Sequence, residues 1–515
     1  MLKVRLSSIL YAFLGLSCIV ISLLITSCSS SKEELEKKPN IVFFFTDDQT
    51  YKAVHALGNS TIITPNLDRL VADGTTFTHA YNMGGWNGAI CAASRAMLQS
   101  GRSLWRANEF RQKWIDNDSV ALDQTWARLM ERNGYDTYMT GKWHVDAPAS
   151  TIFQTASHIR PGMPRDHWNQ RKKDKEAYKQ YESLEDIMPV GYNRPTDPND
   201  NSWSPVDTSM GGFWQGGKHW SEVIKDDAIS FINSASNKEN PFFMYLAFNA
   251  PHDPRQAPQS FLDLYPIDSI PLPDNWLPFN PYALDIGNSP GLRDEALAPF
   301  PRTEYAIRKH IQEYYAIITH LDEQIGEILN ELEAKGLMEN THIIFTADHG
   351  LAVGQHGFIG KQNQYDHSIR VPLVITGPGI PKNEKRTQCV YLQDIMPTTL
   401  ELANIDQPEY VEFQSLIPYT KNKNEPAKRN NIYGAYIDFQ RMIKVGDYKL
   451  IVYPKISKTL LYNLKDDPEE QYNIAVESAN KSKVLEMLAT LIKEQELLND
   501  NLDLKSLLNQ LDTSI

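Results

Sequence analysis

Five short apolar runs recur along the chain and predict buried β-strands. Each is rich in β-branched or aromatic residues and lacks the polar alternation that one solvent-exposed face would require. They lie at residues 41–46, 137–140, 242–248, 342–346 and 373–375, and helical stretches lie between them at 67–73, 122–132, 221–236 and 304–335. This order predicts an α/β fold with a mainly parallel central sheet sandwiched by helices.

The pattern changes near residue 432. Short segments punctuated by turns are followed by one helical stretch, at residues 441–445, 448–453, 460–464 and 484–497. Such a series predicts a small C-terminal α+β subdomain with an antiparallel sheet and a closing helix. Earlier in the chain, residues 161–212 are rich in charge, Pro, Asn and Trp, and we expect them to form long loops over the functional site.

The first residues resemble an export signal. Lys3 and Arg5 supply positive charge, and residues 9–25 are almost continuously apolar. The sequence ITSC at 25–28 resembles a bacterial lipoprotein box, in which Cys28 is lipidated and becomes the new N-terminus. Because the apolar run is near the length needed to cross a bilayer, an uncleaved membrane helix is the alternative. We predict an outer-membrane lipoprotein, held at the membrane by its lipid anchor and facing the periplasm or the cell surface.

These patterns divide the chain into four parts. They are a lipoprotein signal peptide at 1–27, a polar tether at 28–38, a main catalytic domain at 39–425 and a C-terminal subdomain at 426–515.

Charge and cysteine content narrow the possible partners. The 515 residues carry a formal net charge of -13, which argues against nucleic acid as a partner because phosphate binding requires basic surface. A few cations in a cleft can still bind a small anion. Of the four cysteines, Cys18 lies in the signal and Cys28 would carry lipid, so Cys91 and Cys389 remain. The mature protein therefore has no disulfide framework.

Acidic residues close two of the predicted strands. Asp47 and Asp48 end the first, and Asp348 and His349 end a later one. Adjacent buried carboxylates are unfavourable unless a cation neutralises them, and oxygen-rich ligand sets suit a hard divalent cation. In isolation, each pair is equally typical of a helix cap or a surface turn. Their shared position after buried strands favours a metal site, because ligands bind beyond the carboxyl ends of parallel strands.

Four basic or titratable residues occupy similar positions. Lys142 and His144 are two residues apart, so in an extended chain both point to the same side. His252 comes just after another predicted strand, and Lys361 follows a glycine-rich segment. A single histidine or lysine in a loop is usually only solvated, so the significance of these residues depends on the whole set.

The segment that begins at Cys91 carries the most specific motif. Cys91, Ala93 and Arg95 form the pattern C-x-A-x-R. It resembles the signature that maturation enzymes read when they oxidise a sulfatase cysteine to formylglycine. A buried structural thiol is the alternative, but the polar, glycine-rich approach at 82–88 makes that role less fitting. If Cys91 opens a helix, the helix N-terminus favours nearby negative charge, and Arg95 lies one turn later on the same face.

With these motifs in order, the mature chain resembles a type I, formylglycine-dependent sulfatase of the alkaline phosphatase superfamily, of the bacterial lipoprotein type that degrades glycans. The resemblance implies an alkaline-phosphatase-like fold. It also implies a formylglycine-generating maturation enzyme as a partner and calcium as cofactor. The calcium ligands would be Asp47, Asp48, Asp348, His349 and the matured residue 91. Ala93 stands where a proline is commoner in the maturation motif.

The resemblance also implies catalytic roles. The hydrate of the aldehyde at residue 91 attacks sulfur, and its second hydroxyl permits turnover where a plain Ser or Cys would leave a stable ester. Arg95 would orient the hydrate, and His144 would assist its proton movements. Lys142 and Lys361 would neutralise the sulfuryl oxygens, and His252 would protonate the leaving alcohol.

The predicted substrate is a sulfated carbohydrate, cleaved by an exo-acting enzyme and carrying galactose or N-acetylgalactosamine. Asp253 and Arg255 follow His252 and would bind sugar hydroxyls; alternatively, they pair with each other. Choline sulfate and aryl sulfates remain alternative substrates. Two other classes share such a fold: a phosphoesterase or phosphonate hydrolase, and a catalytically silent glycan-binding lipoprotein. The silent class would have lost the nucleophile or the metal carboxylates, and this chain retains both.

Overall fold

The computed structural model describes residues 37–160, 162, 197–199, 204–209, 211–298 and 300–513. Residues Pro39–Ile515 form one compact unit. The predicted signal peptide, Cys28, most of the tether and most of the predicted loop region 161–212 lie outside the described residues. None of the helices in the described ranges is both long enough and apolar enough to cross a membrane.

A nine-stranded sheet forms the centre of the fold, with the order β10-β2-β9-β7-β1-β6-β4-β5 and β8 paired to β2. Its middle and one edge consist of parallel strands, as the apolar runs predicted. These strands are β7 (Thr341–Ala347), β1 (Asn40–Asp47), β6 (Phe242–Pro251), β4 (Asp136–Lys142) and β5 (Thr155–Arg160). Their carboxyl ends therefore lie side by side at one end of the strands.

The other edge of the sheet differs from the prediction. The run at 373–375 forms β9 (Leu373–Thr376), but β9 is antiparallel to both of its neighbours. An apolar composition reports burial on both faces and carries no information on strand direction, which explains this error. The remaining strands are β2 (Gly74–Tyr81), β8 (Arg370–Val371) and β10 (Glu384–Tyr391). Both β2 and β10, like β5, are rich in polar residues, so hydrophobic pattern alone did not reveal them.

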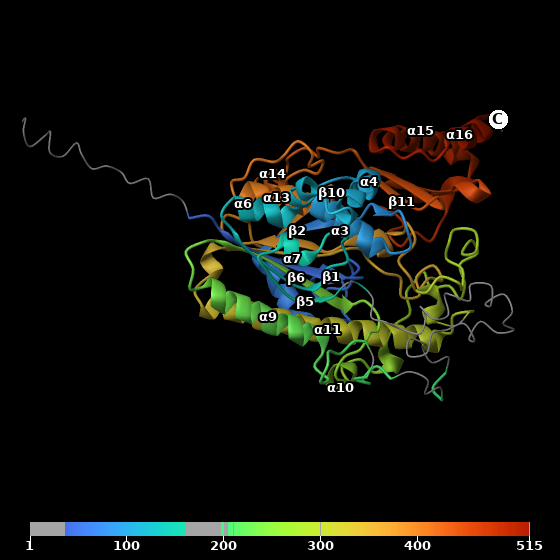
Figure 1. Ribbon diagram of the computed structural model, residues 1–515. Helices are drawn as coiled ribbons and strands as arrows, with labels where there is room; N and C mark the ends of the chain where they lie inside the picture. The colour runs from blue at the N-terminus through green and yellow to red at the C-terminus, as the bar shows by residue number, and fades with distance from the viewer. Residues whose placement is uncertain are drawn as a thin grey trace, which may run out of the picture. The chain divides into compact units, whose positions relative to one another are not determined.

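Helices cover both faces of the sheet (Figure 1). On one face lie α2 (Pro65–Asp73), α9 (Trp220–Ala235) and α11 (Glu304–Ala334), and on the other lie α3 (Ile90–Ser100), α4 (Leu104–Ile115), α6 (Trp126–Arg132) and α13 (Ile395–Leu402). The helix predicted at 122–132 is in fact two, because Thr125 is extended and separates α5 (Ser119–Asp123) from α6. The described residues also form short helices: α7 (Ala149–Ile152), α10 (Gln259–Leu262), α12 (Asp366–Ile369) and α14 (Ile417–Lys421).

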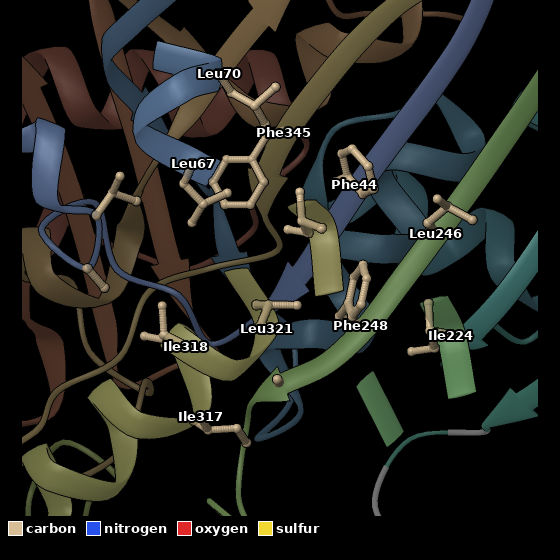
Figure 2. Close-up of a cluster of buried hydrophobic side chains, with 14 of the residues drawn as sticks. Phe44, Leu67, Leu70, Ile224, Leu246, Phe248, Ile317, Ile318, Leu321 and Phe345 are labelled. Atoms are coloured by element: carbon tan, nitrogen blue, oxygen red, sulfur yellow. The ribbon is translucent and has the colours of Figure 1, made fainter. Parts of the chain in front are cut away.

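The core is divided by the sheet into two apolar layers. Side chains of β1 alternate between them: Phe44 packs toward α2, α9 and α11, whereas Phe43 and Phe45 pack toward α6. Figure 2 shows the first layer, in which Phe345 of the sheet lies beside Leu67 of α2, and Phe44 of β1 and Leu321 of α11 belong to the same apolar cluster. Each large side chain buried in this way stabilises the fold by roughly 1.5–3 kcal/mol. These layers hold the strand ends in fixed positions relative to one another.

The C-terminal region contains the predicted antiparallel sheet, with the strand order β14-β13-β12-β11. Its strands are β11 (Asn431–Tyr436), β12 (Gln440–Val445), β13 (Tyr448–Tyr453) and β14 (Lys458–Asn463), and α15 (Lys481–Leu498) and α16 (Lys505–Thr513) follow. A fifth strand, β3 (Gly84–Gly85), comes from the segment just before Cys91 and pairs with β11. A Cβ on Gly84 would lie 1.9 Å from the Ala435 carbonyl oxygen, so only glycine permits this close approach.

Candidate active site

The carboxyl ends of the parallel strands assemble one polar cluster. Asp47 and Lys142 are the last residues of β1 and β4, and Asp348 and His252 directly follow β7 and β6. Because β7, β1, β6 and β4 are consecutive in the sheet, these side chains are brought to the same edge. All four are almost fully buried. The sheet topology therefore joins residues that are far apart in the sequence.

Two overlapping groups at this edge have the geometry of a cation site. Ligand atoms of Asp47, Cys91, Asp348 and His349 all lie within 4.8 Å of one another. Those of Asp47, Asp48 and His252 meet the same distance criterion. The structure thus brings together every residue for which the sequence predicted metal ligation.

The donor atoms are arranged to receive a cation. The Gly350 carbonyl oxygen is 2.8 Å from His349 Nδ1 and can only accept, so Nδ1 carries the proton and Nε2 presents its lone pair. Among the described residues, neither His349 Nε2 nor Asp47 Oδ1 has a hydrogen-bond partner. Carboxylate oxygens with one imidazole nitrogen form a ligand set that suits a hard divalent cation such as calcium.

The electrostatics of the carboxylates point the same way. Burial raises the pKa of Asp48 well above its ordinary value, and the neighbouring Asp47 and Asp348 add to this although Lys361 opposes it. Burial and Asp348 also raise the pKa of Asp47, but Lys142, His252 and other nearby groups outweigh them and hold it below its ordinary value. Lys142, Lys361 and Arg95 face the three carboxylates, but burial still holds Asp48 toward its neutral form, and a divalent cation beside it would favour the ionised form.

The backbone at Asp48 is held in a strained conformation. Asp48 has φ 72°, in the left-handed region that few non-glycine residues adopt. The hydroxyl of Tyr314, from α11, donates to the Asp48 carbonyl oxygen at 2.7 Å and accepts from the Thr50 amide at 3.0 Å. Tyr314 therefore fixes the chain on both sides of Gln49. No sequence motif marked this tyrosine, because its partners are distant in sequence.

Cys91 lies at the start of α3, as predicted, and only 3% of its surface is exposed. Its Sγ is 3.2 Å from Nδ1 of His144. Burial, with the nearby Lys142 and Arg95, lowers the pKa of His144 to about 3, so the imidazole is neutral and its unprotonated ring nitrogen can accept a hydrogen bond. His144 also has a left-handed backbone, with φ 53°. The structure thus places a proton acceptor directly against the predicted nucleophile.

Arg95 lies one turn after Cys91 and is fully buried. Its Nε donates to Asp348 Oδ2 at 2.9 Å and its Nη1 donates to the Lys142 carbonyl oxygen at 2.6 Å. The guanidinium therefore ties the α3 N-terminus to the ends of β7 and β4. This supporting role adds to the predicted one, which was to orient the residue at position 91.

The two predicted lysines contact the carboxylates. Lys142 forms an ion pair with Asp47 Oδ2, and Lys361 Nζ lies 2.8 Å from Asp48 Oδ1. Both lysines are buried. An anion bound at this edge would therefore meet two ammonium groups aimed at the same small volume.

His252 reaches the same cluster from the end of β6, beside Asp47 and Asp48. Its Nδ1 donates to the Asp253 carbonyl oxygen at 2.8 Å, which leaves Nε2 directed toward Asp48, 3.8 Å away. Burial and the nearby Lys361 and Lys142 lower the pKa of His252 well below its ordinary value. The Asp253 carboxylate forms an ion pair with Arg293, a residue that the sequence reasoning did not select.

The structure separates the two residues predicted to bind sugar. Asp253 lines a pocket beside Asp47, Lys142 and His252. Arg255 does not line that pocket: it is fully buried, and its Nη1 lies 2.6 Å from His310 Nδ1 on α11. Within the described residues, Asp253 and Arg255 form no ion pair with each other. The Asp253 carboxylate pairs with Arg293 instead.

The same pocket is walled by residues that the motifs missed. Arg160 at the end of β5 lies over the ring of Trp220 at 4.9 Å, and both line the pocket together with His219 and Asn249. Asn249 precedes His252 near the end of β6, so its position after an apolar strand was an available signal. Arg160 carries no such signal because β5 is a polar strand, and Trp220 is the first residue of α9 rather than the end of a strand.

Comparison with known proteins identifies the family to which this chain belongs. The sulfatase family matches residues 39–405, most of the chain, and a second match, described as N-sulphoglucosamine sulphohydrolase, C-terminal, covers residues 354–497. The chain is 26% identical to an N-acetylglucosamine-6-O-sulfatase of Bacteroides thetaiotaomicron, over 93% of this chain and 90% of that protein. It is 28% identical to an arylsulfatase of Clostridium perfringens, over 89% and 95% respectively.

Solved structures share the fold. One, described as a complex with its substrate D-glucosamine-2-N,6-O-disulfate, has a TM-score of 0.66 at 23% identity and covers 90% of this chain and 99% of its own. A phosphonate monoester hydrolase of Silicibacter pomeroyi has a TM-score of 0.67 at 18% identity, with coverage of 90% and 96%. The fold alone therefore does not choose between sulfate and phosphonate esters, whereas the family match does. On that match the chain belongs to the sulfatase family and is a sulfuric ester hydrolase.

Proposed function

We propose that this sulfatase hydrolyses a sulfate ester carried by a glycan, using a formylglycine formed from Cys91 together with bound calcium. One observation carries the proposal: Cys91 Sγ lies within 4.8 Å of ligand atoms from Asp47, Asp348 and His349, and 3.2 Å from His144. A structural thiol needs neither neighbour. A nucleophile formed at that position needs both a cation and a proton acceptor.

Asp47, Asp48, Asp348 and His349, with the matured residue 91, are the residues that would hold calcium. When bound, the cation supplies positive charge that lowers the energy of negative oxygens on the nucleophile and on the sulfuryl group. The fit rests on the unpartnered Asp47 Oδ1 and His349 Nε2 in a dry cluster of carboxylates.

The residues of the site would divide the reaction into two steps. One hydroxyl of the aldehyde hydrate at residue 91 loses its proton and its oxygen forms a bond to sulfur, while the bond from sulfur to the sugar oxygen breaks and that oxygen takes up a proton. The second hydroxyl then loses its proton, the carbon–oxygen bond to sulfate breaks, and the aldehyde and free sulfate result. His144 is placed to take that second proton, because its Nδ1 already lies against the residue 91 side chain.

Charge on the transferred group would be balanced by the two lysines. Lys142 and Lys361 already sit on Asp47 and Asp48, so a sulfuryl group placed between them gains two donors without moving them far. His252 would give the leaving sugar oxygen its proton through Nε2. Its pKa is depressed in the absence of substrate, and the negative charge of a bound sulfate ester would raise it.

The glycan part of the proposal rests on the relatives and on the pocket. The similar proteins include one named for N-acetylglucosamine 6-O-sulfate, and one similar structure is described with a sulfated glucosamine as its substrate. The pocket presents Asp253 and Asn249, whose oxygens and amide suit sugar hydroxyls, beside His252. We retain galactose and N-acetylgalactosamine as candidate sugars and an exo-acting mode. We also propose export and lipidation at Cys28, on the sequence pattern alone.

A panel of defined monosulfated sugars tests the proposal. It would include the 4-O- and 6-O-sulfates of galactose, N-acetylgalactosamine and N-acetylglucosamine, with choline sulfate, an aryl sulfate and the matching aryl phosphate. We expect at least one sugar sulfate to be turned over far faster than the phosphate. Peptide mass spectrometry of the active enzyme should show the aldehyde at residue 91, and Cys91→Ala should abolish turnover without unfolding. A fully active enzyme with an intact thiol would overturn the mechanism.

A further inference from the structure

A second pocket lies outside the catalytic cluster, against the C-terminal region. It has a cavity volume of about 420 Å³, within the range of roughly 300–1,000 Å³ typical of small-ligand sites. Four segments form it: the stretch before α3 that carries Trp86, α4, the turn between β11 and β12 with the start of β12, and the segment that joins α15 to α16. None of the roles assigned above to the catalytic residues uses this pocket.

The lining combines aromatic rings with neutral polar groups. Trp86 and Trp105 contribute half-buried indoles, and Asn108, Asn499 and Asn501 contribute amides. Trp105 is held in place because its Nε1 donates to the Tyr433 hydroxyl at 2.9 Å. A sugar ring has apolar C–H faces and a polar edge of hydroxyls, so rigid aromatic rings beside amides that both donate and accept match it.

The cation in the lining of this pocket is already paired, which argues against an anionic ligand. Arg441 is the cation of the lining, and its Nε and Nη2 donate to Asp500 at 2.6 and 2.8 Å. Asp438 at the rim forms an ion pair with Lys455 at 2.9 Å. Glu109 adds one exposed carboxylate. A sulfate group would thus find no available ammonium or guanidinium in this lining, whereas hydroxyl groups would find several acceptors.

The pocket is connected to the nucleophile by short contacts. Trp86 belongs to the segment that leads into Cys91, and the Ile437 amide donates to the Gly85 carbonyl oxygen at 2.9 Å. On α4, Arg111 lies 5.9 Å from the Trp86 ring and pairs at 2.7 Å with Asp146, which follows His144 in the chain. The segment that leads into Cys91 therefore contacts both α4 and the turn between β11 and β12, two of the segments that form the pocket.

We propose that the pocket of Trp86, Trp105, Asn108, Glu109 and Asn501 binds an unsulfated sugar residue of the glycan whose sulfate ester is cleaved beside Cys91. The inference rests on the proposed function for the identity of the chain. It makes the enzyme selective for oligosaccharides over isolated sulfated monosaccharides, because the second contact is available only to a longer substrate.

The test uses the exposed rim, where substitution leaves the core untouched. Glu109→Ala/Asn501→Ala removes two exposed polar side chains of the pocket. Asn237→Ala/Glu239→Ala is the matched control, an exposed pair that precedes β6 at the far end of its strand. We expect the first variant to lose about fivefold or more in kcat/KM on a sulfated tetrasaccharide, with turnover of an aryl sulfate unchanged. The control should match the parent on both.

Equilibrium binding separates this inference from the proposed function. Neoagarotetraose and chitotetraose are neutral probes of galactose and N-acetylglucosamine chemistry, and isothermal titration with the full chain should detect at least one of them. The double rim variant should lose that binding. If the parent hydrolyses no sulfate ester, the proposed function fails, and retained probe binding would still support the pocket. If neither probe binds and the variant keeps full kcat/KM on the tetrasaccharide, the pocket assignment is overturned.

Discussion

Two clusters of buried polar side chains in this protein differ in how fully their carboxylates are hydrogen-bonded. At the C-terminal region, Asp500 accepts two hydrogen bonds from Arg441 and a third from Tyr433 at 2.9 Å. These partners outweigh burial and lower the pKa of Asp500. At the sheet edge, Asp48 has its pKa raised well above the ordinary value by burial, and Asp47 Oδ1 lacks a partner among the described residues.

The difference distinguishes a structural ion pair from a binding site. A buried carboxylate that already has its donors contributes to stability, and losing one partner leaves the other charge uncompensated. A cluster that keeps unpartnered ligand atoms, and in which burial drives one carboxylate toward its neutral form, is completed only when a cation binds. Replacing an aspartate by asparagine should therefore abolish the calcium response at the sheet edge and lower the stability of the fold at the C-terminal region.

The largest effect is expected for Asp48→Asn at the sheet edge. Removing this carboxylate should lower kcat by at least about 10³-fold, because a ligand of the proposed cation and the partner of Lys361 are lost together. Calcium should no longer raise the melting temperature, whereas the calcium-free variant should be at least as stable as the calcium-free parent. Differential scanning fluorimetry with and without EGTA measures both. A variant that still responds to calcium like the parent would argue against ligation by Asp48.

Asp500→Asn should give the reverse result. Leaving Arg441 without its buried partner should lower the free energy of unfolding by about 3–5 kcal/mol. The calcium-induced rise in melting temperature and the kcat of the folded enzyme should persist. Urea titration at neutral pH measures the stability. Loss of the calcium response here would mean that the two clusters are coupled and the comparison is too simple.

The stability difference between the parent and Asp500→Asn should depend on pH. The folded pKa of Asp500 lies below the ordinary value of 3.8, so its ionised form stabilises the fold at pH values above about 4. As the pH falls through the unfolded and then the folded pKa, that contribution is lost and the two proteins should converge. Urea midpoints measured at intervals from pH 7 downward follow this. A difference that stays constant below pH 4 would assign the effect to packing.

The smallest effect is expected for Tyr314→Phe. The Asp48 carbonyl oxygen and the Thr50 amide would lose their common partner, and the left-handed backbone at Asp48 would be less firmly held. We expect the affinity of the metal-free protein for calcium to fall by about tenfold. This corresponds to about 1.4 kcal/mol, which is within the range expected for the two hydrogen bonds that are lost. Tyr315→Phe is the matched control, since its hydroxyl accepts from Asn59 instead. Equal calcium affinities in the two variants would mean that Tyr314 contributes to the stability of the fold and not to calcium binding.

Much of the site followed from the sequence because its chemistry is local to strand ends. Asp47, Asp348, Lys142 and His252 follow apolar runs, and parallel strands place their ends together. Cys91 was marked by its short motif and lies at a helix start as expected. These features depend on residue type and on position within an element, both of which can be read from the chain.

Contacts between distant segments could not be read in this way. No sequence pattern indicated that Arg293 would pair with Asp253, or that Arg255 would contact His310 on α11. The direction of β9 was also misjudged, since burial shapes composition equally in parallel and antiparallel strands.

The sequence by itself determined the chemical inventory, the α/β order and the strand ends at which the reactive groups stand, because these follow from local pattern. Only the tertiary structure decided which carboxylate oxygen lacks a hydrogen-bond partner among the described residues, which tyrosine holds the backbone at Asp48, and that the segment before Cys91 adds a strand to the C-terminal sheet. Such choices depend on the packing of segments hundreds of residues apart, where burial and hydrogen-bond satisfaction are set by the whole fold.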